Sequence, residues 1–299
     1  MLKRDRLQHL GENNRLNKIK KRKQISLDMG YSVLMSVYYK ERPEYLKASM
    51  KSIYEQTVPT DDFVLVCDGP LNKGLDLVVE QMQALFGNKL QVVRLEENRG
   101  LGNALNEGMK KCHCPLVARM DSDDISRPDR CERQLKIFKD HPDIDIVSGI
   151  IEEFENDPSQ IVGRRKPPEH NEEIVQYAKT RNPFNHPCVM YKKERVEAAG
   201  GYQDFYLLED YYLWIRMILK KYRGYNIQEP LLWMRTGNGM YKRRSGWKYV
   251  ISQKRLFQYM KKQGFISTSL YYRSIIIRTA SSLFPNELRT FLYRTFLRN

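Results

Sequence analysis

Short apolar runs alternate with amphipathic segments about ten residues long between residues 31 and 120, and this alternation is the feature that most constrains the fold. Strands are predicted at 31–38, 62–67, 90–95 and 115–120, and helices at 44–56, 75–85 and 101–110. A strand, a helix and a second strand in this order form a right-handed unit with parallel strands. The sequence therefore predicts an α/β fold with a mostly parallel central sheet flanked by helices.

Polar residues follow the carboxyl ends of all four of these strands. They are Tyr39 and Glu41 after the first strand, Asp68 after the second, Asn98-Arg99-Gly100 after the third, and Asp121-Ser122-Asp123-Asp124 at the fourth. Parallel α/β sheets bind ligands in the crevice beyond these ends. One polar residue at a strand end is ordinary loop chemistry, but four successive ends that offer carboxylates, an amide and glycine predict one binding crevice.

The fourth strand ends in three carboxylates within four residues, those of Asp121, Asp123 and Asp124. Carboxylates this close repel one another and raise each other's pKa, so a bound cation is the simplest way of keeping them charged. Hard oxygen ligands suit Mg²⁺ or Mn²⁺, which also bind substrate phosphates. Taken alone, such a cluster more often marks a loop with an Asp-rich helix cap, here before Pro128.

The positive charge is concentrated at the two ends of the chain. Of a net charge of +15, residues 1–30 carry +6 and residues 242–299 carry +12, which leaves −3 for residues 31–241. A protein that binds nucleic acid usually carries its basic residues on the folded body. We therefore expect no nucleic-acid partner, and an anionic membrane surface is the partner that fits the two basic ends.

The sequence contains no recognisable export or membrane-spanning signal. Residues 1–30 lack the apolar centre of a signal peptide, and an uninterrupted apolar run of about 18 residues is absent. Five cysteines, an odd number without a zinc-like pair, indicate free thiols in a reducing compartment. We expect a cytoplasmic protein that is peripheral on the inner face of the cell membrane.

The second half of the chain is less regular. Helices are expected at 129–139, 171–179 and 210–220, strands at 144–151 and at the end of 185–191, and a loop at 164–168. After Gly246 the chain mixes apolar residues with Arg and Lys, and 271–277 and 291–297 have the pattern of amphipathic helices. We expect a basic tail at 1–30, an α/β domain at 31–246, and a basic amphipathic helical extension at 247–299 that either lies on a membrane or packs on the domain.

Six short motifs occur in order along residues 31–240: Ser36 to Tyr39, Asp68-Gly69, Asn98-Arg99-Gly100, Asp121-Ser122-Asp123-Asp124, Gly200-Gly201-Tyr202 and Glu209-Asp210. Together they resemble those of the inverting glycosyltransferases of family 2, and in particular bacterial enzymes of O-antigen, capsule and exopolysaccharide synthesis. The resemblance implies the GT-A fold, which has a Rossmann-like sheet flanked by helices. Tyr39 and Cys67 stand where many members carry Asn and Asp.

The resemblance also implies a role for each motif. Asp123 would bind the metal directly, with Asp121 in the metal shell or on the ribose, and Asp68 would read the uracil base. Asp210 would be the catalytic base, and Glu209 would orient it or contact the acceptor. The complete set of expected donor-binding residues is Tyr39, Glu41, Asp68, Asn98, Arg99, Gly100, Arg119, Asp121 and Ser122.

Three residues are candidates for binding the acceptor: His186, Tyr211 and Trp214. Aromatic rings beside the base can stack on a sugar face. Each candidate has a structural alternative, because Tyr211 and Trp214 can equally belong to the core and His186 can be a structural histidine. Arg119, likewise, either meets a phosphate or pairs with a neighbouring Asp.

The motifs and the basic ends together predict a metal-dependent, inverting glycosyltransferase that moves one hexose from UDP-Glc, UDP-Gal or a UDP-HexNAc. The expected acceptor is a hydroxyl of a polyprenyl-diphosphate-linked saccharide. Addition of a single sugar is expected because residues 243–247 do not match the Gln-x-x-Arg-Trp motif of processive members. The alternatives are a polyprenyl-monophosphate sugar synthase, a nucleotidyltransferase and a nucleic-acid-binding protein.

Overall fold

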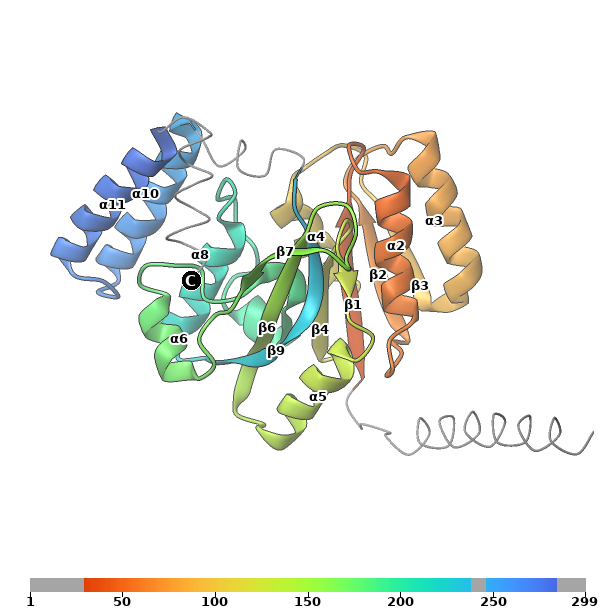
Figure 1. Cartoon of the computed structure of the whole chain (residues 1–299), viewed down its shortest axis with the longest axis horizontal. Coiled ribbons are helices and arrows are strands. Elements are labelled where there is room, and N and C mark those ends of the chain that lie inside the picture. Colours follow the sequence, from red (N-terminus) through yellow and green to blue (C-terminus); the bar gives the residue numbers. More distant parts are fainter. Residues whose placement is uncertain (1–29, 238–245, 284–299) are drawn as a thin grey trace, which may run out of the picture.

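Nine strands form one sheet, with helices on both faces, within residues 30–237 and 246–283, which the computed structural model describes (Figure 1). The strands are β1 (Tyr31–Val37), β2 (Asp62–Cys67), β3 (Leu90–Arg94), β4 (Leu116–Asp121), β5 (Ile125–Ser126), β6 (Ile144–Phe154), β7 (Ile161–Arg165), β8 (Met190–Lys192) and β9 (Arg223–Arg235). The α-helices are α2 (Pro43–Tyr54), α3 (Lys73–Phe86), α4 (Leu101–Met109), α5 (Arg130–Asp140), α6 (Asn171–Tyr177), α7 (Lys193–Ala198), α8 (Glu209–Leu219), α10 (Trp247–Lys262) and α11 (Thr268–Leu283). Two short 3₁₀ turns, η1 (Gly87–Lys89) and η2 (His186–Cys188), complete the described elements.

The sheet combines a parallel half with a mixed half. Its strand order is β3-β2-β1-β4-β8-β6-β9-β5, with β7 paired to β6 outside this path. β1 to β4 are parallel to one another, which confirms the prediction for the first half of the chain. β8 runs antiparallel to β4 and β6, whereas β6 and β9 are parallel.

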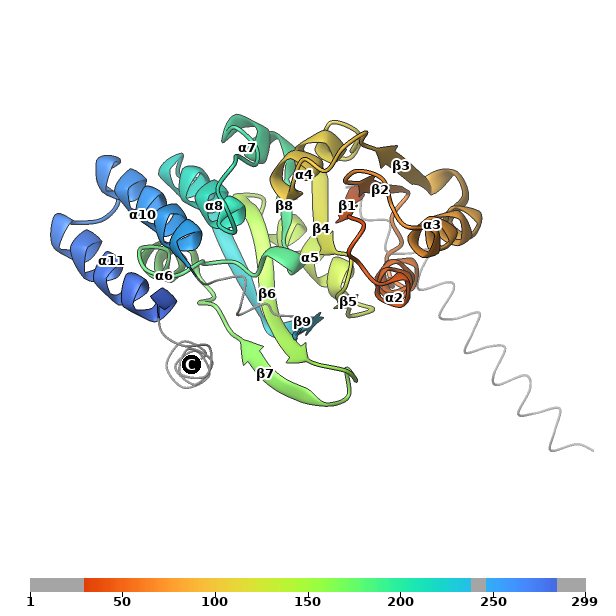
Figure 2. The ribbon, with the colours of Figure 1, turned by 90° about the horizontal axis from the view of Figure 1, so that it is seen from above.

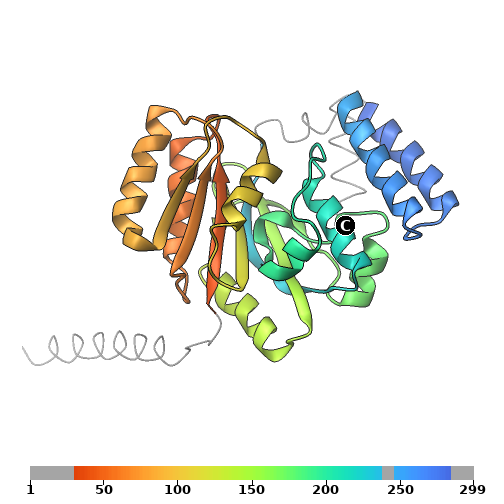
Figure 3. The same cartoon turned by 180° about the vertical axis from the view of Figure 1, so that it is seen from behind.

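Two apolar layers cover the two faces of the sheet (Figures 2 and 3). In one layer Met50 of α2 and Phe138 of α5 pack on the strands, and in the other Leu105 of α4 and Leu213 of α8 do so. Because successive side chains of a strand point to opposite faces, the buried strand β1 contributes to both layers. The continuous apolar run at the start of the domain follows from this burial on both sides.

β9 has no counterpart among the elements expected from the sequence. Its pairing with β6 shifts register between Gly149 and Ile150, and Pro230 lies opposite Ile150 at that irregularity. Proline lacks the N–H group that a regular ladder requires, so a proline inside a run argues against a strand. Here the shift in register accommodates it.

The loop expected at 164–168 was wrong in part, because Arg164 and Arg165 belong to β7. Arg164 forms a salt bridge with Glu152, and Arg165 forms one with Glu153 at 2.7 Å. Both partners lie on the buried strand β6. The two charged pairs therefore hold a hairpin that its polar sequence did not suggest.

α10 and α11 form a helical hairpin beside α8, at the end of the molecule opposite α3 (Figure 1). Leu256 and Met260 of α10 share one apolar cluster with Tyr211 and Ile215 of α8. The helix expected at 271–277 is confirmed as part of α11. The described part of the extension thus packs on the domain.

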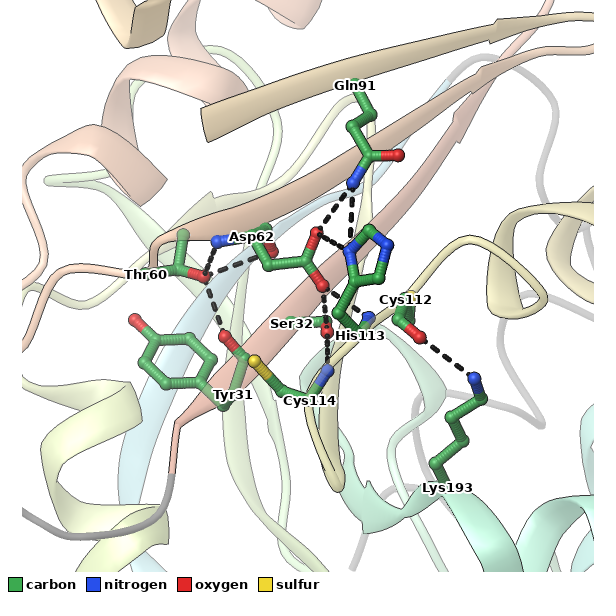
Figure 4. A network of polar contacts seen from close by, with 9 residues as sticks. All are labelled: Tyr31, Ser32, Thr60, Asp62, Gln91, Cys112, His113, Cys114 and Lys193. Atoms are coloured by element: carbon green, nitrogen blue, oxygen red, sulfur yellow. Dashed lines mark hydrogen bonds and ion pairs between the residues drawn. The ribbon is translucent and has the colours of Figure 1, made fainter. Parts of the chain in front are cut away.

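A buried carboxylate ties together the edge of the sheet at which β1 and β2 begin (Figure 4). Asp62 accepts hydrogen bonds from the Ser32 hydroxyl, from the backbone N–H of His113 at 2.7 Å and from the Gln91 amide at 3.1 Å. The backbone N–H of Cys114 donates in turn to Ser32 at 3.1 Å. Both carboxylate oxygens of Asp62 therefore have donors, as a buried charge requires.

No helix among the described residues is long and apolar enough to cross a bilayer. Most of the expected basic tail at 1–30, the expected helix at 291–297 and part of the stretch 243–247 lie outside the described residues.

Candidate active site

The carboxyl ends of β1, β2 and β4 lie side by side at one edge of the sheet (Figure 1). Ser36 of β1 is opposite Asp121 of β4, and Val37 of β1 is opposite Cys67 of β2. Since these strands are parallel, the loops that follow them meet at this edge. The crevice predicted from the strand ends is therefore the place where the candidate residues gather.

Asp121, Asp123 and Asp124 lie close enough to share one cation, because each offers a carboxylate oxygen within 4.8 Å of the others. Burial, and then the neighbouring Asp121 and Glu41, raises the pKa of Asp123 to about 7. Burial, followed by Asp123 and Asp121, raises the pKa of Asp124 well above its usual range. A divalent cation favours charged carboxylates and would relieve this crowding, and the oxygen-only donor set fits Mg²⁺ or Mn²⁺.

Arg119 lies beneath this cluster on β4, and its side chain is 1% exposed. It forms a salt bridge with Asp121, so the pairing that was the alternative to a phosphate contact is present. Its Nε and Nη1 atoms have no hydrogen-bond partner in the described structure. A buried donor without a partner costs free energy, so the phosphate contact stays open as a prediction.

Arg235, at the end of β9, holds the carboxylate loop from the other side. Its backbone N–H donates to Asp124 at 2.8 Å, and its Nε donates to the carbonyl of Asp123 at 3.2 Å. The guanidinium also lies 3.8 Å from the centre of the Tyr45 ring. No motif indicated Arg235, because the strand that carries it was not predicted.

Asp68 organises the loop that begins α4. Its two carboxylate oxygens accept backbone N–H groups, from Arg99 at 2.7 Å and from Gly100 at 3.0 Å. The Asn98 amide donates to the Asp68 carbonyl at 3.2 Å. A Cβ atom on Gly69, where φ is +85°, would lie 2.7 Å from the Asn98 nitrogen, so these two loops are in close contact. The structure thus brings four of the expected residues together, and the uracil contact of Asp68 stays a prediction.

Glu41 connects the loop after β1 with the carboxylate cluster. The Ser122 hydroxyl donates to Glu41 at 2.9 Å. Tyr39 is 51% exposed, and its carbonyl accepts the Asn72 amide at 3.0 Å. The backbone of this loop is therefore anchored while the Tyr39 side chain stays accessible to a ligand.

α8 begins with the expected pair Glu209-Asp210. The Asn182 amide donates to Asp210 at 2.6 Å, and the backbone N–H of Tyr211 donates at 2.7 Å. A helix N-terminus also favours negative charge. Burial, with a smaller contribution from Asp210, raises the pKa of Glu209 to about 7. No sequence signal indicated Asn182, which lies between α6 and η2.

Tyr202 and Glu209 both lie against α4, since a Cβ atom on Gly102 would be 3.5 Å from Tyr202 Cβ and 3.5 Å from Glu209 Cγ. The Tyr202 hydroxyl and His186 Nε2 are 3.1 Å apart. Burial raises the pKa of Tyr202, and the charges of Arg119, Asp210 and Asp121 all act on the same hydroxyl. Burial and then Arg119 lower the pKa of His186 well below its usual value, so the ring is neutral near pH 7. Because α4 begins directly after the loop that Asp68 binds, the Glu209-Asp210 pair lies next to the strand-end loops.

Tyr211 and Trp214 lie in the interior, with 2% and 0% of their surfaces exposed. The Tyr211 hydroxyl donates to the Ala178 carbonyl at 2.7 Å. The Trp214 ring meets the Phe184 ring edge-on at a centroid distance of 5.8 Å. Both residues therefore belong to the core, which was the structural alternative to binding the acceptor.

Comparison with a solved structure defines the class of the fold. A mannosyltransferase from Pyrobaculum calidifontis, in complex with GDP-Man and Mn²⁺, superposes with a TM-score of 0.62 at 17% identity, over 84% of this chain and 69% of that chain. At this identity the match concerns the fold alone. It agrees with the strand order and confirms that the protein has the GT-A fold.

Comparisons of sequence identify the family. Residues 32–198 match the model of Glycosyl transferase family 2. The amylovoran biosynthesis glycosyltransferase AmsE of Erwinia amylovora is 38% identical over 266 residues, which cover 88% of this chain and 97% of that protein. The UDP-Gal:alpha-D-GlcNAc-diphosphoundecaprenol beta-1,3-galactosyltransferase of Escherichia coli is 37% identical over 268 residues, which cover 90% and 96%. The chain belongs to glycosyl transferase family 2 and is a glycosyltransferase, as the motifs predicted.

Proposed function

We propose that the protein transfers one hexose from a UDP-sugar to a hydroxyl of a polyprenyl-diphosphate-linked saccharide, in the synthesis of a surface polysaccharide. The observation that carries the proposal is that Glu209, next to Asp210, lies against Gly102 in the first turn of α4, two residues after the Gly100 N–H that Asp68 accepts. The E. coli relative is named for a UDP-Gal donor and a diphosphoundecaprenol acceptor, and the Erwinia relative for amylovoran biosynthesis. Both names support this choice of donor and acceptor.

On the donor side, Asp123 and Asp121 would hold Mg²⁺ or Mn²⁺, and the cation would supply positive charge to neutralise the departing diphosphate. Asp68 reads the base, and Arg119 orients Asp121 through their salt bridge. The proposed donor pocket is completed by residues of the same four loops: Tyr39, Glu41, Asn98, Arg99, Gly100 and Ser122. Its fit to a nucleoside diphosphate is supported by the crowding of the three Asp carboxylates.

On the acceptor side, Asp210 takes the proton of the acceptor hydroxyl while that oxygen attacks the anomeric carbon. The bond from the anomeric carbon to the diphosphate oxygen breaks, and UDP leaves with the electron pair. Attack from the side opposite the leaving group inverts the anomeric configuration, so an α-linked donor gives a β-glycoside. Asn182 holds the Asp210 carboxylate during this step.

Glu209 and His186 are proposed to position the acceptor. A pKa of about 7 leaves Glu209 partly protonated near neutral pH, so it can donate a hydrogen bond to a sugar hydroxyl beside Asp210. The neutral His186 ring presents one donor and one acceptor nitrogen. The proposal leaves out Tyr211 and Trp214, because both side chains are buried.

The proposed enzyme adds one sugar per binding event and works at the cytoplasmic face of the membrane, where it is peripheral. The cationic residues 242–299 support attraction to anionic lipid. A polyprenyl-linked acceptor requires the catalytic edge of the sheet to reach the bilayer surface.

The test is to incubate the full chain with Mn²⁺, a panel of UDP-hexoses and UDP-HexNAcs, and a polyprenyl-diphosphate-linked saccharide. We expect release of UDP and a product with inverted anomeric configuration by NMR. Release of inorganic diphosphate would identify a nucleotidyltransferase instead. Transfer only to polyprenyl monophosphate would identify a sugar-phosphate synthase, and a retained configuration would rule out the proposed role of Asp210.

A further inference from the structure

Three large apolar side chains of α11 are exposed. Tyr272, Ile276 and Ile277 are 58%, 68% and 56% exposed. Tyr272 and Ile276, four positions apart, lie on one side of the helix, and Ile277 follows Ile276 beside the exposed Arg273. These three exposed apolar side chains are here called the α11 face. Tyr271 and Ser274, by contrast, are buried toward the rest of the molecule.

The charged residues of the described hairpin that carries the α11 face are all basic. Residues 247–283 contain seven Lys or Arg and no Asp or Glu. The ammonium group of Lys261 lies 5.5 Å from the centre of the Tyr272 ring, and Lys262 and Arg273 are exposed close by in the sequence of the hairpin. An apolar strip with a cationic rim is the pattern of helices that lie in the interface of an anionic bilayer.

α3, at the other end of the molecule, shows what an ordinary exposed apolar residue looks like in this protein (Figure 1). Leu77 and Leu85 of α3 are 54% and 41% exposed. They are eight positions apart, and Asp76 and Glu80 flank Leu77 in the same helix. Single exposed apolar residues are normal, and carboxylates beside them would repel anionic lipid.

The hairpin is placed so that lipid binding would bring the catalytic edge to the membrane. The start of α10 and the end of α11 lie toward the same edge of the molecule as the carboxyl ends of β1 and β2 (Figures 1 and 3). Trp247, the first residue of α10, is 66% exposed there. An aromatic residue at this position suits the headgroup region, where rings with a polar edge are favoured.

We infer that the α11 face docks the protein on an anionic lipid bilayer. Charge complementarity favours the bilayer over a second copy of the chain. A two-fold contact through this face would bring Arg273 and Lys262 of both copies together without any acidic partner from α10 or α11. The inference rests on the proposed function in one respect, because it is the lipid-linked acceptor that gives membrane docking a purpose.

The experiment compares the full-length wild type with the triple variant Tyr272→Ser, Ile276→Ser, Ile277→Ser. Co-sedimentation is measured with vesicles of phosphatidylcholine alone and of phosphatidylcholine mixed with phosphatidylglycerol. We expect the triple variant to lose at least about tenfold in affinity for the anionic vesicles, since each exposed Ile would bury apolar surface in the bilayer. The matched control is Leu77→Ser, Leu85→Ser on α3, which should bind like wild type.

Activity on a water-soluble saccharide diphosphate separates this inference from the proposed function. The triple variant should keep wild-type turnover on that acceptor, since the three substituted side chains are exposed and none belongs to the proposed catalytic or donor-binding residues. Absence of turnover in the wild type would refute the proposed function and leave the vesicle comparison valid. If the triple variant has a lowered melting temperature, Ile276→Ser alone replaces it. We then expect about a threefold loss of affinity for the anionic vesicles.

Two results would overturn the inference. One is binding of the folded variants to anionic vesicles with wild-type affinity. The other is a dimer in the wild type that sedimentation velocity shows to be a monomer in the triple variant, because a second copy would then be the occupant of the α11 face.

Discussion

Carboxylates lie at both edges of the same sheet, and their surroundings differ in kind. At the edge where β2 begins, Asp62 receives donors on both oxygens from Ser32, His113 and Gln91 (Figure 4). At the edge where β4 ends, Asp123 faces other carboxylates, and burial and this crowding raise its pKa to about 7. The first arrangement is complete as it stands, whereas the second would be completed by the cation that we propose.

This difference separates carboxylates that hold the fold from carboxylates that bind a ligand. A buried charge whose partners all come from the protein stabilises one conformation. A buried cluster of like charges opposes folding until a cation or protons neutralise it, so it is expected where function requires it. We therefore expect substitutions at the first edge to lower stability and leave activity unchanged. Substitutions at the second edge should lower activity or metal affinity without lowering the stability of the metal-free protein.

The largest effect is expected from Asp210→Asn, which removes the proposed base at the catalytic edge. Turnover should fall by about 10²- to 10⁴-fold, the usual contribution of a general base. The Kd for UDP with Mn²⁺, measured by calorimetry, should stay unchanged. At the other edge, Asp62→Asn should keep wild-type kcat once folded. A fall in kcat for Asp62→Asn as large as for Asp210→Asn would erase the distinction between the edges.

A smaller effect is expected from pH on metal affinity. Because the pKa of Asp123 is raised from 3.8 to about 7 in the folded chain, protons compete with the cation below about pH 7. Affinity for Mn²⁺ should therefore rise by up to about tenfold per unit as the pH increases toward 7. Calorimetry at several pH values measures the slope, and Asp123→Asn should flatten it. An Asp123→Asn variant with the wild-type slope would exclude Asp123 as the titrating group.

The smallest effects are expected on the stability of the metal-free protein. Asp62→Asn should lower the free energy of unfolding by about 2 kcal/mol, because in either orientation the amide NH₂ group would face a donor, that of Gln91 or those of Ser32 and His113. Above about pH 7, Asp123→Asn should leave the free energy of unfolding unchanged or raise it. A carboxyl with a raised folded pKa contributes stability that is present below its unfolded pKa and lost as the pH rises through about 7. Urea unfolding above and below about pH 7 measures the free energy of unfolding of both variants. A larger loss of stability for Asp123→Asn than for Asp62→Asn above about pH 7 would contradict the account.

The first half of the fold and its strand-end residues could be predicted because each expected strand ends in a polar residue at the same edge. Asp68 and the Asn98-Arg99-Gly100 turn are distant in sequence, but the parallel order of β1 to β4 brings them together. Tyr211 and Trp214 could not be assigned, because apolar spacing in a helix is the same for a core residue and for a sugar platform.

The remainder depends on contacts that leave no local pattern. Pro230 lies within β9 and argues against a strand there, so β9 was not predicted. Arg235, whose backbone N–H donates to Asp124, was therefore not predicted either. Asn182 contacts Asp210 from a loop between α6 and η2, and an isolated Asn has no periodicity to indicate its partner. Such tertiary contacts appear only when the strands and helices are placed in space.

The affinity for UDP with and without Mn²⁺ tests most directly whether the three Asp residues form a metal site. Calorimetry should show wild-type UDP binding strengthened at least about tenfold by Mn²⁺, as expected when a cation bridges carboxylates and phosphates. Asp123→Asn should lose this gain, whereas Asp62→Asn should keep it. UDP binding in wild type that does not change on adding Mn²⁺ or Mg²⁺ would contradict the metal site.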